Sequence, residues 1–190
     1  MAQMIVLLRA LVHPREEHRL HELRNGAVEA LSAAAGFLGA SVWRASHENH
    51  DYMLVLQFES PAAAEDALTR VSERGLLSSA TGILQGPPEV RRVLMDGSDG
   101  MVPDQVAPGH LMSLSVREAG PGYGADLLQE IDDIFQELSN LEGYLGSIRG
   151  TNEVIDDEVI GMVFWRTPEA FHRSVSPNAL RRIELFQRSL

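Results

Sequence analysis

The chain contains one four-residue pattern twice, as Gly36-Phe37-Leu38-Gly39 and as Gly143-Tyr144-Leu145-Gly146. The shift of 107 positions between the two copies (143 minus 36) also aligns other landmarks, among them Pro14 with Pro121, Leu20 with Leu127, Pro61 with Pro168 and Ala63 with Ala170. A constant shift over so many positions indicates an internal duplication. We therefore expect two related modules, residues 1–95 and 110–190, joined by a linker at residues 96–109 that is rich in Gly, Pro and Asp.

Both modules are expected to be ferredoxin-like, and module one to have the full element order βαββαβ. Apolar runs bounded by turn residues predict strands, and apolar residues at spacings of three and four predict helices. A glycine after the first helix and a Ser-Pro or Thr-Pro step before the second mark their ends. In module one the predicted elements are Met4–Val12, Arg15–Ala35, Phe37–Ala45, Tyr52–Phe58, Pro61–Arg74 and Glu89–Met95.

This order predicts an α+β fold in which helices cover one face of an antiparallel, ferredoxin-like sheet. The first strand, Met4–Val12, is apolar on both faces. Its second face therefore has to be covered by another layer, and the sheet of the other module is the available cover.

Module two is predicted to lack a fourth strand. After Ser176-Pro177 the chain reads as a short helix, Ala179–Leu190, and then ends. We expect the fourth strand of module one, Glu89–Met95, to cross over to the second sheet.

Composition excludes several classes of chemistry and of partner. The 190 residues include no cysteine, so disulfides, thiolate metal sites and thiol nucleophiles are excluded. The net charge of −11, from 16 basic and 27 acidic residues, argues against nucleic acid as a partner. No apolar run approaches the roughly 20 residues of a membrane-spanning helix, and no signal peptide is evident, so a cytoplasmic location is expected.

The first strand of module two has one polar face. Ser113, Ser115 and Arg117 alternate with apolar residues, and module one has Val6 and Leu8 where module two has the two serines. Either this face is wetter than its counterpart, or it lines a pocket that offers a few hydrogen-bonding groups.

The repeated residues resemble the antibiotic-biosynthesis monooxygenase (ABM) domain of the dimeric α+β barrel superfamily. The resemblance rests on Gly-(Phe/Tyr)-Leu-Gly after the first helix and on an aromatic-x-(Ser/Thr)-Pro-x-Ala step into the second, and it covers nearly the whole chain in two copies. In that family two modules usually pair as a homodimer, so the resemblance implies a pseudo-dimeric barrel within one chain. These glycines and prolines are structural residues, and a fold does not by itself imply a function.

The resemblance offers two kinds of chemistry. The haem-degrading branch uses an Asn on the first strand and a Trp and a His on or after the second helix, whereas this chain has no Asn on either first strand and has Ser174 and Glu184 at the other two positions. The second branch consists of cofactor-free oxygenases, in which a quinol or polyphenol supplies the electrons to O2. The resemblance therefore favours a protein without a cofactor.

The candidate catalytic residues are Arg117, His172 and Trp165, because a histidine can accept a phenolic proton and an arginine can stabilise the resulting oxyanion. Alternatively, Trp165 is a core aromatic and His172 a solvated helix residue. The candidate pocket residues are Ser113, Ser115, Tyr144 and Phe171, and module one offers the set Arg9, Trp43, Tyr52 and Phe58.

No metal site or nucleotide site is expected. His47, His50 and Asp51 have suitable donor atoms, but a polar hairpin turn explains them more simply. His18 and His21 are explained by a solvent-facing helix surface. No phosphate-binding glycine loop, nucleophile elbow or zinc-protease motif occurs.

The function predicted from the sequence is a cofactor-independent, monooxygenase-like protein that acts on a small aromatic or quinol-type molecule. The alternative is a non-catalytic barrel with a ligand-binding or structural role, and haem binding without the usual residues is a third reading. The substrate and any further self-association of the intramolecular pseudo-dimer into a homo-oligomer are not determined by the sequence.

Overall fold

The computed structural model describes residues 2–73, 75, 82–175 and 183–189. The elements run in the order β1 (Met4–Leu11), α1 (Glu17–Ser32), β2 (Phe37–Ala45), β3 (Asp51–Phe58), α2 (Pro61–Glu73), β4 (Glu89–Gly100), β5 (Leu111–Glu118), α4 (Gly124–Leu138), β6 (Tyr144–Asn152), β7 (Glu158–Trp165), α5 (Pro168–Ser174) and β8 (Glu184–Arg188). The described elements of module two thus repeat the order of module one.

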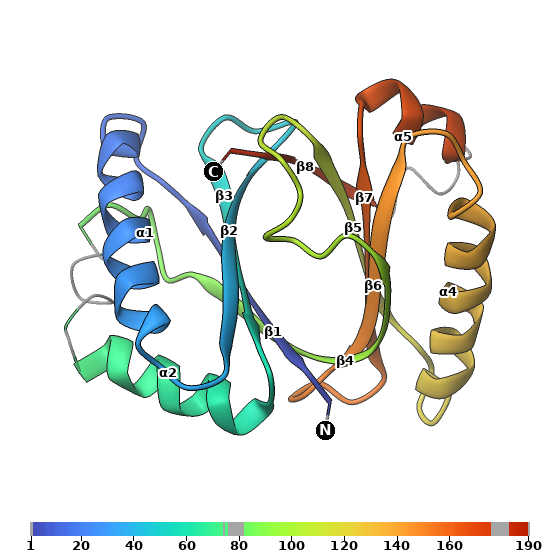
Figure 1. Ribbon diagram of the computed structural model, residues 1–190, viewed down its shortest axis with the longest axis horizontal. Coiled ribbons are helices and arrows are strands. Elements are labelled where there is room, and N and C mark those ends of the chain that lie inside the picture. The colour runs from blue at the N-terminus through green and yellow to red at the C-terminus, as the bar shows by residue number, and fades with distance from the viewer. Residues whose placement is uncertain (1, 74, 76–81, 176–182, 190) are drawn as a thin grey trace.

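The strands form one closed antiparallel barrel in the order β1-β3-β2-β8-β5-β7-β6-β4. Figure 1 shows the barrel as a ring between two helical layers, with α1 and α2 outside one wall and α4 and α5 outside the other. This arrangement confirms the α+β fold with two ferredoxin-like modules that share a pseudo-dimeric barrel.

Strand β4 joins the two modules, as predicted, because it pairs with β1 on one side and with β6 on the other. The predicted extent of this strand, Glu89–Met95, is too short. The strand continues through Gly100, and Gly97–Gly100 pair with β6 beyond an irregularity in register. Residues of low strand propensity adopt the strand here because β6 supplies the partners for their backbone groups.

The prediction that module two lacks a fourth strand is wrong. Glu184–Arg188 form β8, which pairs with β5 of its own module and with β2 of module one. The predicted helix at Ala179–Leu190 is also wrong where the structure describes it, and its first part, residues 179–182, lies outside the described residues. Phe186 is fully buried inside the barrel, so tertiary packing overrides the local preference for a helix.

The interior of the barrel is filled with apolar side chains from both modules. Trp43 of β2 stacks on Phe164 of β7, with ring centroids 5.8 Å apart. Val102 and Val106, which follow β4, pack on the same cluster, and their segment lies across the barrel opening that faces the viewer in Figure 1. The barrel interior is thus a shared hydrophobic core.

The repeated glycines are explained by one contact that occurs in each module. Gly36 and Gly143 have positive φ angles of 78° and 91°, and an added Cβ on either would approach the Cβ of Ala63 or Ala170 to 2.7 or 2.5 Å. The alanines belong to helices that begin where the sequence predicts, because Ser60 and Thr167 accept hydrogen bonds from the backbone N–H groups of Ala63 and Ala170. The motif therefore fixes the second helix of each module against the turn after the first.

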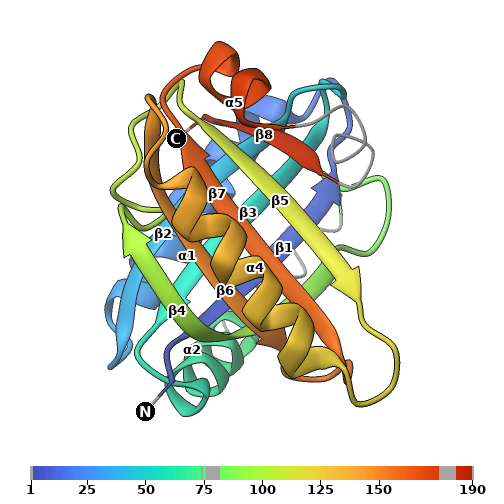
Figure 2. The same cartoon turned by 90° about the vertical axis from the view of Figure 1, so that its right-hand side faces the viewer.

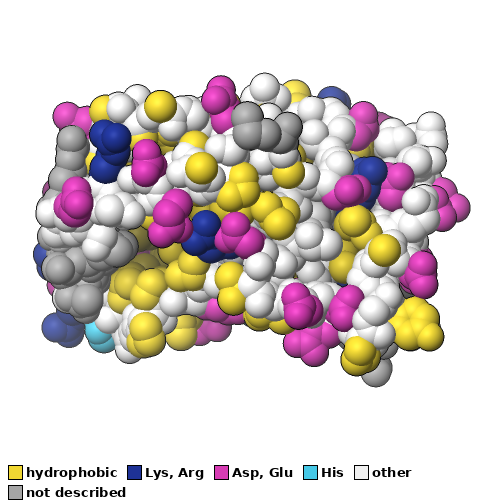
Figure 3. All heavy atoms as spheres, turned by 90° about the horizontal axis from the view of Figure 1, so that it is seen from below, with side chains coloured by type: hydrophobic (Ala, Val, Ile, Leu, Met, Phe, Trp, Pro, Cys, Tyr) yellow, Lys and Arg dark blue, Asp and Glu magenta, His cyan; other side chains and the backbone are white. Residues whose placement is uncertain are grey.

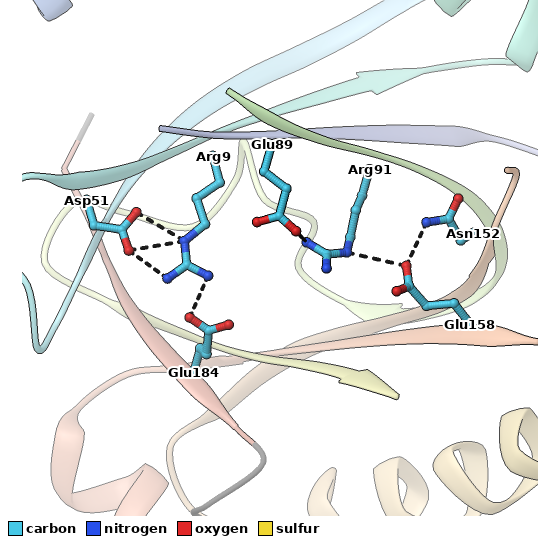
Figure 4. Close-up of polar contacts among 7 residues, drawn as sticks. All are labelled: Arg9, Asp51, Glu89, Arg91, Asn152, Glu158 and Glu184. Atoms are coloured by element: carbon cyan, nitrogen blue, oxygen red, sulfur yellow. Dashed lines mark hydrogen bonds and ion pairs between the residues drawn. The ribbon is translucent and has the colours of Figure 1, made fainter. Parts of the chain in front are cut away.

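Charged side chains close the other end of the barrel and link the modules (Figure 4). Arg9 of β1 bonds Asp51 of β3 and, at 2.6 Å, Glu184 of β8. Arg91 of β4 bonds Glu89 and, at 3.3 Å, the buried Glu158 of β7. Asn152 also donates a hydrogen bond to Glu158, at 2.6 Å. Two arginines of module one thus hold carboxylates of module two.

The glycine–alanine contact gives a first prediction. Gly143→Ala should destabilise the fold more than Gly109→Ala, because Gly109 has a similar φ of 90° but no atom within 4 Å of an added Cβ. We expect Gly109→Ala to cost about 1–2 kcal/mol from backbone strain alone. Gly143→Ala should cost a further 1–3 kcal/mol, roughly, from overpacking. Urea unfolding of both variants measures the difference, and equal losses would contradict this account.

The ion pairs at the barrel end give a second prediction. Arg91→Met removes a partner of the buried Glu158 carboxylate and should lower the free energy of unfolding by about 1–3 kcal/mol. Arg19→Met removes an exposed ion pair with Glu16 and should change it by less than about 1 kcal/mol. Adding Glu158→Gln to Arg91→Met removes the unpaired negative charge of Glu158. The double variant should therefore regain part of the lost free energy of unfolding. If chemical denaturation shows that the double variant is no more stable than Arg91→Met, the ion pair between Arg91 and Glu158 does not stabilise the fold.

Candidate functional site

The outer faces of the two sheets are packed differently. In module one, β1 and β3 present large apolar side chains to the helices, and these fill the space under α1 and α2 with a buried cluster that includes Met4, Val6, Leu31, Leu56 and Phe58. Module one therefore has a conventional sheet-to-helix core at this position.

Module two has smaller side chains at the equivalent positions. Ser113 and Ser115 of β5 stand where module one has Val6 and Leu8, and Gly161 of β7 stands where it has Leu54. Phe135 of α4 occupies part of the freed space, since an added Cβ on Gly161 would lie 2.8 Å from its ring. A pocket of about 60 Å³ remains between α4 and the sheet. Figure 2 shows α4 lying across the outside of this wall.

The inner end of this pocket is formed by Trp165 and Ser113. Trp165 is fully buried, and its indole N–H donates a hydrogen bond to the Ser113 hydroxyl at 3.0 Å. That hydroxyl in turn donates to the backbone carbonyl of Val163 at 3.3 Å. Both residues are thus satisfied structural members of the pocket wall, and Ser113 has no free proton for a ligand.

Arg117 is the polar group with unused donors. Its Nε donates to the Ser115 hydroxyl at 3.1 Å, and no carboxylate pairs with it in the part of the chain that the structure describes. Arg117 lines both the inner pocket and an open vestibule of about 590 Å³ outside it. The vestibule is also lined by Glu118, Gly120, Tyr123, Asp126, Leu127 and Glu130. The half-buried guanidinium therefore lies where the wet vestibule meets the apolar pocket.

The structure brings four of the seven candidate residues together, namely Ser113, Ser115, Arg117 and Trp165. Tyr144 and Phe171 pack against Trp165 but do not line the pocket. The Tyr144 hydroxyl bonds Ser147 and Asp99, and burial raises its pKa to about 12, so it stays protonated. His172 is exposed on α5, beside the ring of Phe171.

Sequence reasoning missed the residues that give the pocket its shape. Gly161 lies on β7, and Ile131, Ile134 and Phe135 lie on α4. The signal for Gly161 was present in the repeat, where it aligns with Leu54, but the helix residues cannot be chosen without the packing. Tyr123, Asp126 and Glu130 of the vestibule were missed for the same reason.

The side chains of the other candidate sites are mostly bonded to neighbouring residues of the protein. His47, Glu48 and Asp51 have donor atoms within 4.8 Å of one another, but both Asp51 oxygens accept hydrogen bonds from Arg9. His50 instead faces Glu17 at 3.0 Å. Glu184, at the position of the haem branch's histidine, lies on β8 and pairs with Arg9 at the barrel end, and Ser174 ends α5.

The surface agrees with the acidic composition. On the face shown in Figure 3, acidic side chains are spread widely and basic ones are few. No helix among the described residues is both long enough and apolar enough to cross a membrane.

The comparisons with known proteins agree with this fold. The family model described as antibiotic biosynthesis monooxygenase matches residues 3–70. A solved structure from Fusobacterium nucleatum, described as a candidate monooxygenase, superposes with a TM-score of 0.77 at 13% identity, covering 100% of this chain and 93% of that one. A candidate monooxygenase from Lactobacillus acidophilus gives 0.73 at 10% identity, with 99% and 94% covered.

An anthrone oxidase-like protein gives a TM-score of 0.75 at 12% identity, with 100% of this chain and 92% of that one covered. Identities this low show a common fold only. No curated protein sequence matches the chain. Residues 3–70 thus match the antibiotic biosynthesis monooxygenase family model, and the described part of the chain has the fold of a tandem, two-module α+β barrel.

Proposed function

We propose that the protein is a cofactor-independent, monooxygenase-like enzyme that oxidises a small phenolic or quinol-type aromatic molecule in module two. The observation that carries this proposal is Arg117, which has no acidic partner among the described residues and lies between an open vestibule and an apolar pocket. A guanidinium in this position favours a bound phenolate over the neutral phenol. It therefore lowers the free energy needed to produce an electron-rich substrate anion.

The vestibule and the inner pocket differ in size in a way that suits the two reactants, an aromatic substrate and O2. The vestibule of about 590 Å³ accommodates an aromatic ring system, and the exposed ring of Tyr123 offers it a stacking surface. The inner pocket of about 60 Å³ is lined mainly by apolar groups and admits a molecule as small as O2. Glu118, Asp126 and Glu130 at the vestibule supply carboxylates that can accept the phenolic proton.

The reaction balances without an external reductant. A carbon activated by the phenolate donates an electron pair to O2, and a C–O bond forms to give a hydroperoxide. Loss of water then breaks the O–O bond and leaves a carbonyl on that carbon. The substrate supplies all four electrons, so one oxygen atom enters the product and the other leaves as water.

Trp165 and Ser113 act in this proposal as the fixed wall of the pocket. His172 has no part in it, because this exposed side chain lines neither compartment. The family match and the likeness to an anthrone oxidase-like protein support the same class of substrate.

A second candidate function is ligand binding without catalysis. It is favoured by the small size of the inner pocket, which leaves the barrel's outer face nearly filled. The two functions differ in whether bound phenol is consumed with O2.

The role of Arg117 is tested with 1,8-dihydroxyanthrone as the probe. The wild-type chain should accelerate O2 uptake over the spontaneous reaction, and Arg117→Gln should lower kcat about 100-fold, as expected when a donor to a developing oxyanion is removed. Arg166→Gln removes an exposed arginine of the same module and should leave kcat unchanged. Equal rates for the two variants would refute the proposal. Binding that depends on Arg117 without O2 uptake would instead support the non-catalytic function.

Filling the pocket is a second test. Ser115→Leu places the residue of module one in the pocket and should abolish O2 uptake by excluding oxygen. It should also raise stability by about 1 kcal/mol, since each Å³ of cavity filled contributes roughly 24 cal/mol. Thermal unfolding measures the change in stability and O2 uptake measures the change in activity, so the two effects are followed separately. Full activity in a variant whose pocket is shown to be filled would contradict the assignment of O2 to this space.

A further inference from the structure

Asp157, in the turn between β6 and β7, has a left-handed backbone that is unusual for its residue type. Its φ angle of 59° is the one positive value among the non-glycine residues that the structure describes. This conformation is unfavourable for a residue with a Cβ, and it persists only where the surrounding structure holds it. Asp157 therefore needs interactions that offset the strain.

The carboxylate of Asp157 holds the loop that joins β5 to α4. Its Oδ2 accepts a hydrogen bond from the backbone N–H of Gly122 at 2.8 Å, and its Oδ1 accepts one from the N–H of Gly124 at 3.1 Å. The backbone carbonyl of Asp157 also accepts a hydrogen bond from the N–H of Ala119 at 2.9 Å. Hydrogen bonds to an ionised carboxylate are stronger than those between neutral groups. These three bonds form a latch over residues 120–123.

The latch depends on a glycine and differs from the equivalent contact in module one. Gly124 is buried at the start of α4, and an added Cβ would lie 2.8 Å from Oδ1 of Asp157. The aligned residues of module one are Glu17 and His50, which meet through their side chains, with His50 Nδ1 3.0 Å from Glu17 Oε1. In module two the same contact fastens the backbone of the loop itself.

The turn that carries Asp157 is anchored to the barrel end. The side-chain oxygen of the buried Asn152 accepts hydrogen bonds from the N–H groups of Val154 at 2.8 Å and Ile155 at 3.2 Å. The side-chain amide of Asn152 donates to the buried Glu158 at 2.6 Å (Figure 4). The latch therefore starts from a turn whose backbone is fixed on both sides of Asp157.

The loop under the latch forms one wall of the vestibule beside Arg117. Ala119, Gly120 and Tyr123 all line this space of about 590 Å³. The side chain of Tyr123 is 63% exposed, so its position is set mainly by the backbone that carries it. A displaced loop would therefore move the surface on which the aromatic substrate is proposed to stack.

We infer that Asp157 is a positioning residue for substrate binding in the vestibule. It acts through Tyr123, because the latch holds residues 120–123 in the conformation that presents this ring to the substrate. Asp157 itself does not line the vestibule. A loop that is ordered before binding binds its ligand more tightly than a loose one, since the cost of ordering is not paid on binding. The inference rests on the function proposed above, in which Arg117 and the inner pocket carry the chemistry.

The test compares Asp157→Gly with His50→Gly, the change at the equivalent position of module one. Glycine adopts a positive φ without strain, so Asp157→Gly removes the carboxylate and should keep the fold. In O2 uptake with 1,8-dihydroxyanthrone, it should raise KM by roughly five- to tenfold, the contribution of one aromatic contact, and leave kcat nearly unchanged. His50→Gly should change neither. Asp157→Asn keeps one acceptor oxygen and should give an intermediate KM.

A second variant tests whether Asp157 acts through Tyr123. Tyr123→Ala should raise KM by a similar factor, and adding Asp157→Gly to it should raise KM little further, since residues that act through one contact are not additive. A full second increase in KM would overturn the role of Tyr123. An unchanged KM in Asp157→Gly, or a fall in kcat alone, would overturn the positioning role itself.

Two measurements separate this inference from the proposed oxidation. Hydrogen exchange at the N–H of Gly124 should be slower in the wild-type chain than in Asp157→Gly, and equal rates would mean that the latch does not hold the loop. The Kd of 1,8-dihydroxyanthrone, measured without O2 by fluorescence quenching, should rise with KM. Binding that weakens in Asp157→Gly, in a wild-type chain that takes up no O2, would refute the oxidation and support the role of Asp157. A wild-type chain that does not bind the anthrone would refute both.

Discussion

The structure depends on the antiparallel pairing of β4 with β6 and of β8 with β2. Each of these strands extends its own module's sheet and also bonds the sheet of the other module, so the two sheets close into a barrel without a free edge between them. Without this closure, Trp43, Phe164 and Phe186 would lie on an open apolar face. The two halves therefore share one core, and neither half buries its inner face alone.

Closure also determines where ligands can bind. Large side chains from both modules fill the interior, valines from the segment after β4 cover one end, and ion pairs around Arg9 and Arg91 occupy the other. The remaining positions are the outer faces of the sheets, beneath or beside the helices. The pocket beside Arg117 lies there.

The repeat predicted most of this fold because its landmarks are local: a glycine with positive φ, a capped Pro turn and an apolar stripe. It failed at Glu184–Arg188, where five residues that suit a helix form a strand. They do so because β2 and β5, already paired on one edge, both take this strand as the partner on the other edge. For the pocket, alternation along β5 was enough to place Ser113, Ser115 and Arg117 on one face of the strand. The contribution of α4 and the position of His172 depend on how a helix lies across the sheet, which alternation does not specify.

A tandem barrel differs from a homodimer in one physical respect, since its two outer faces can change independently. In a homodimer, exchanging Leu54, Val6 and Leu8 for smaller residues would open cavities in both copies at once, with twice the loss of packing energy. Here module one keeps the filled face and module two carries the exchanges. The exchanges also leave Arg117 of module two beside a small pocket, without an acidic partner among the described residues. Duplication thus lets one shared core support two unlike outer faces.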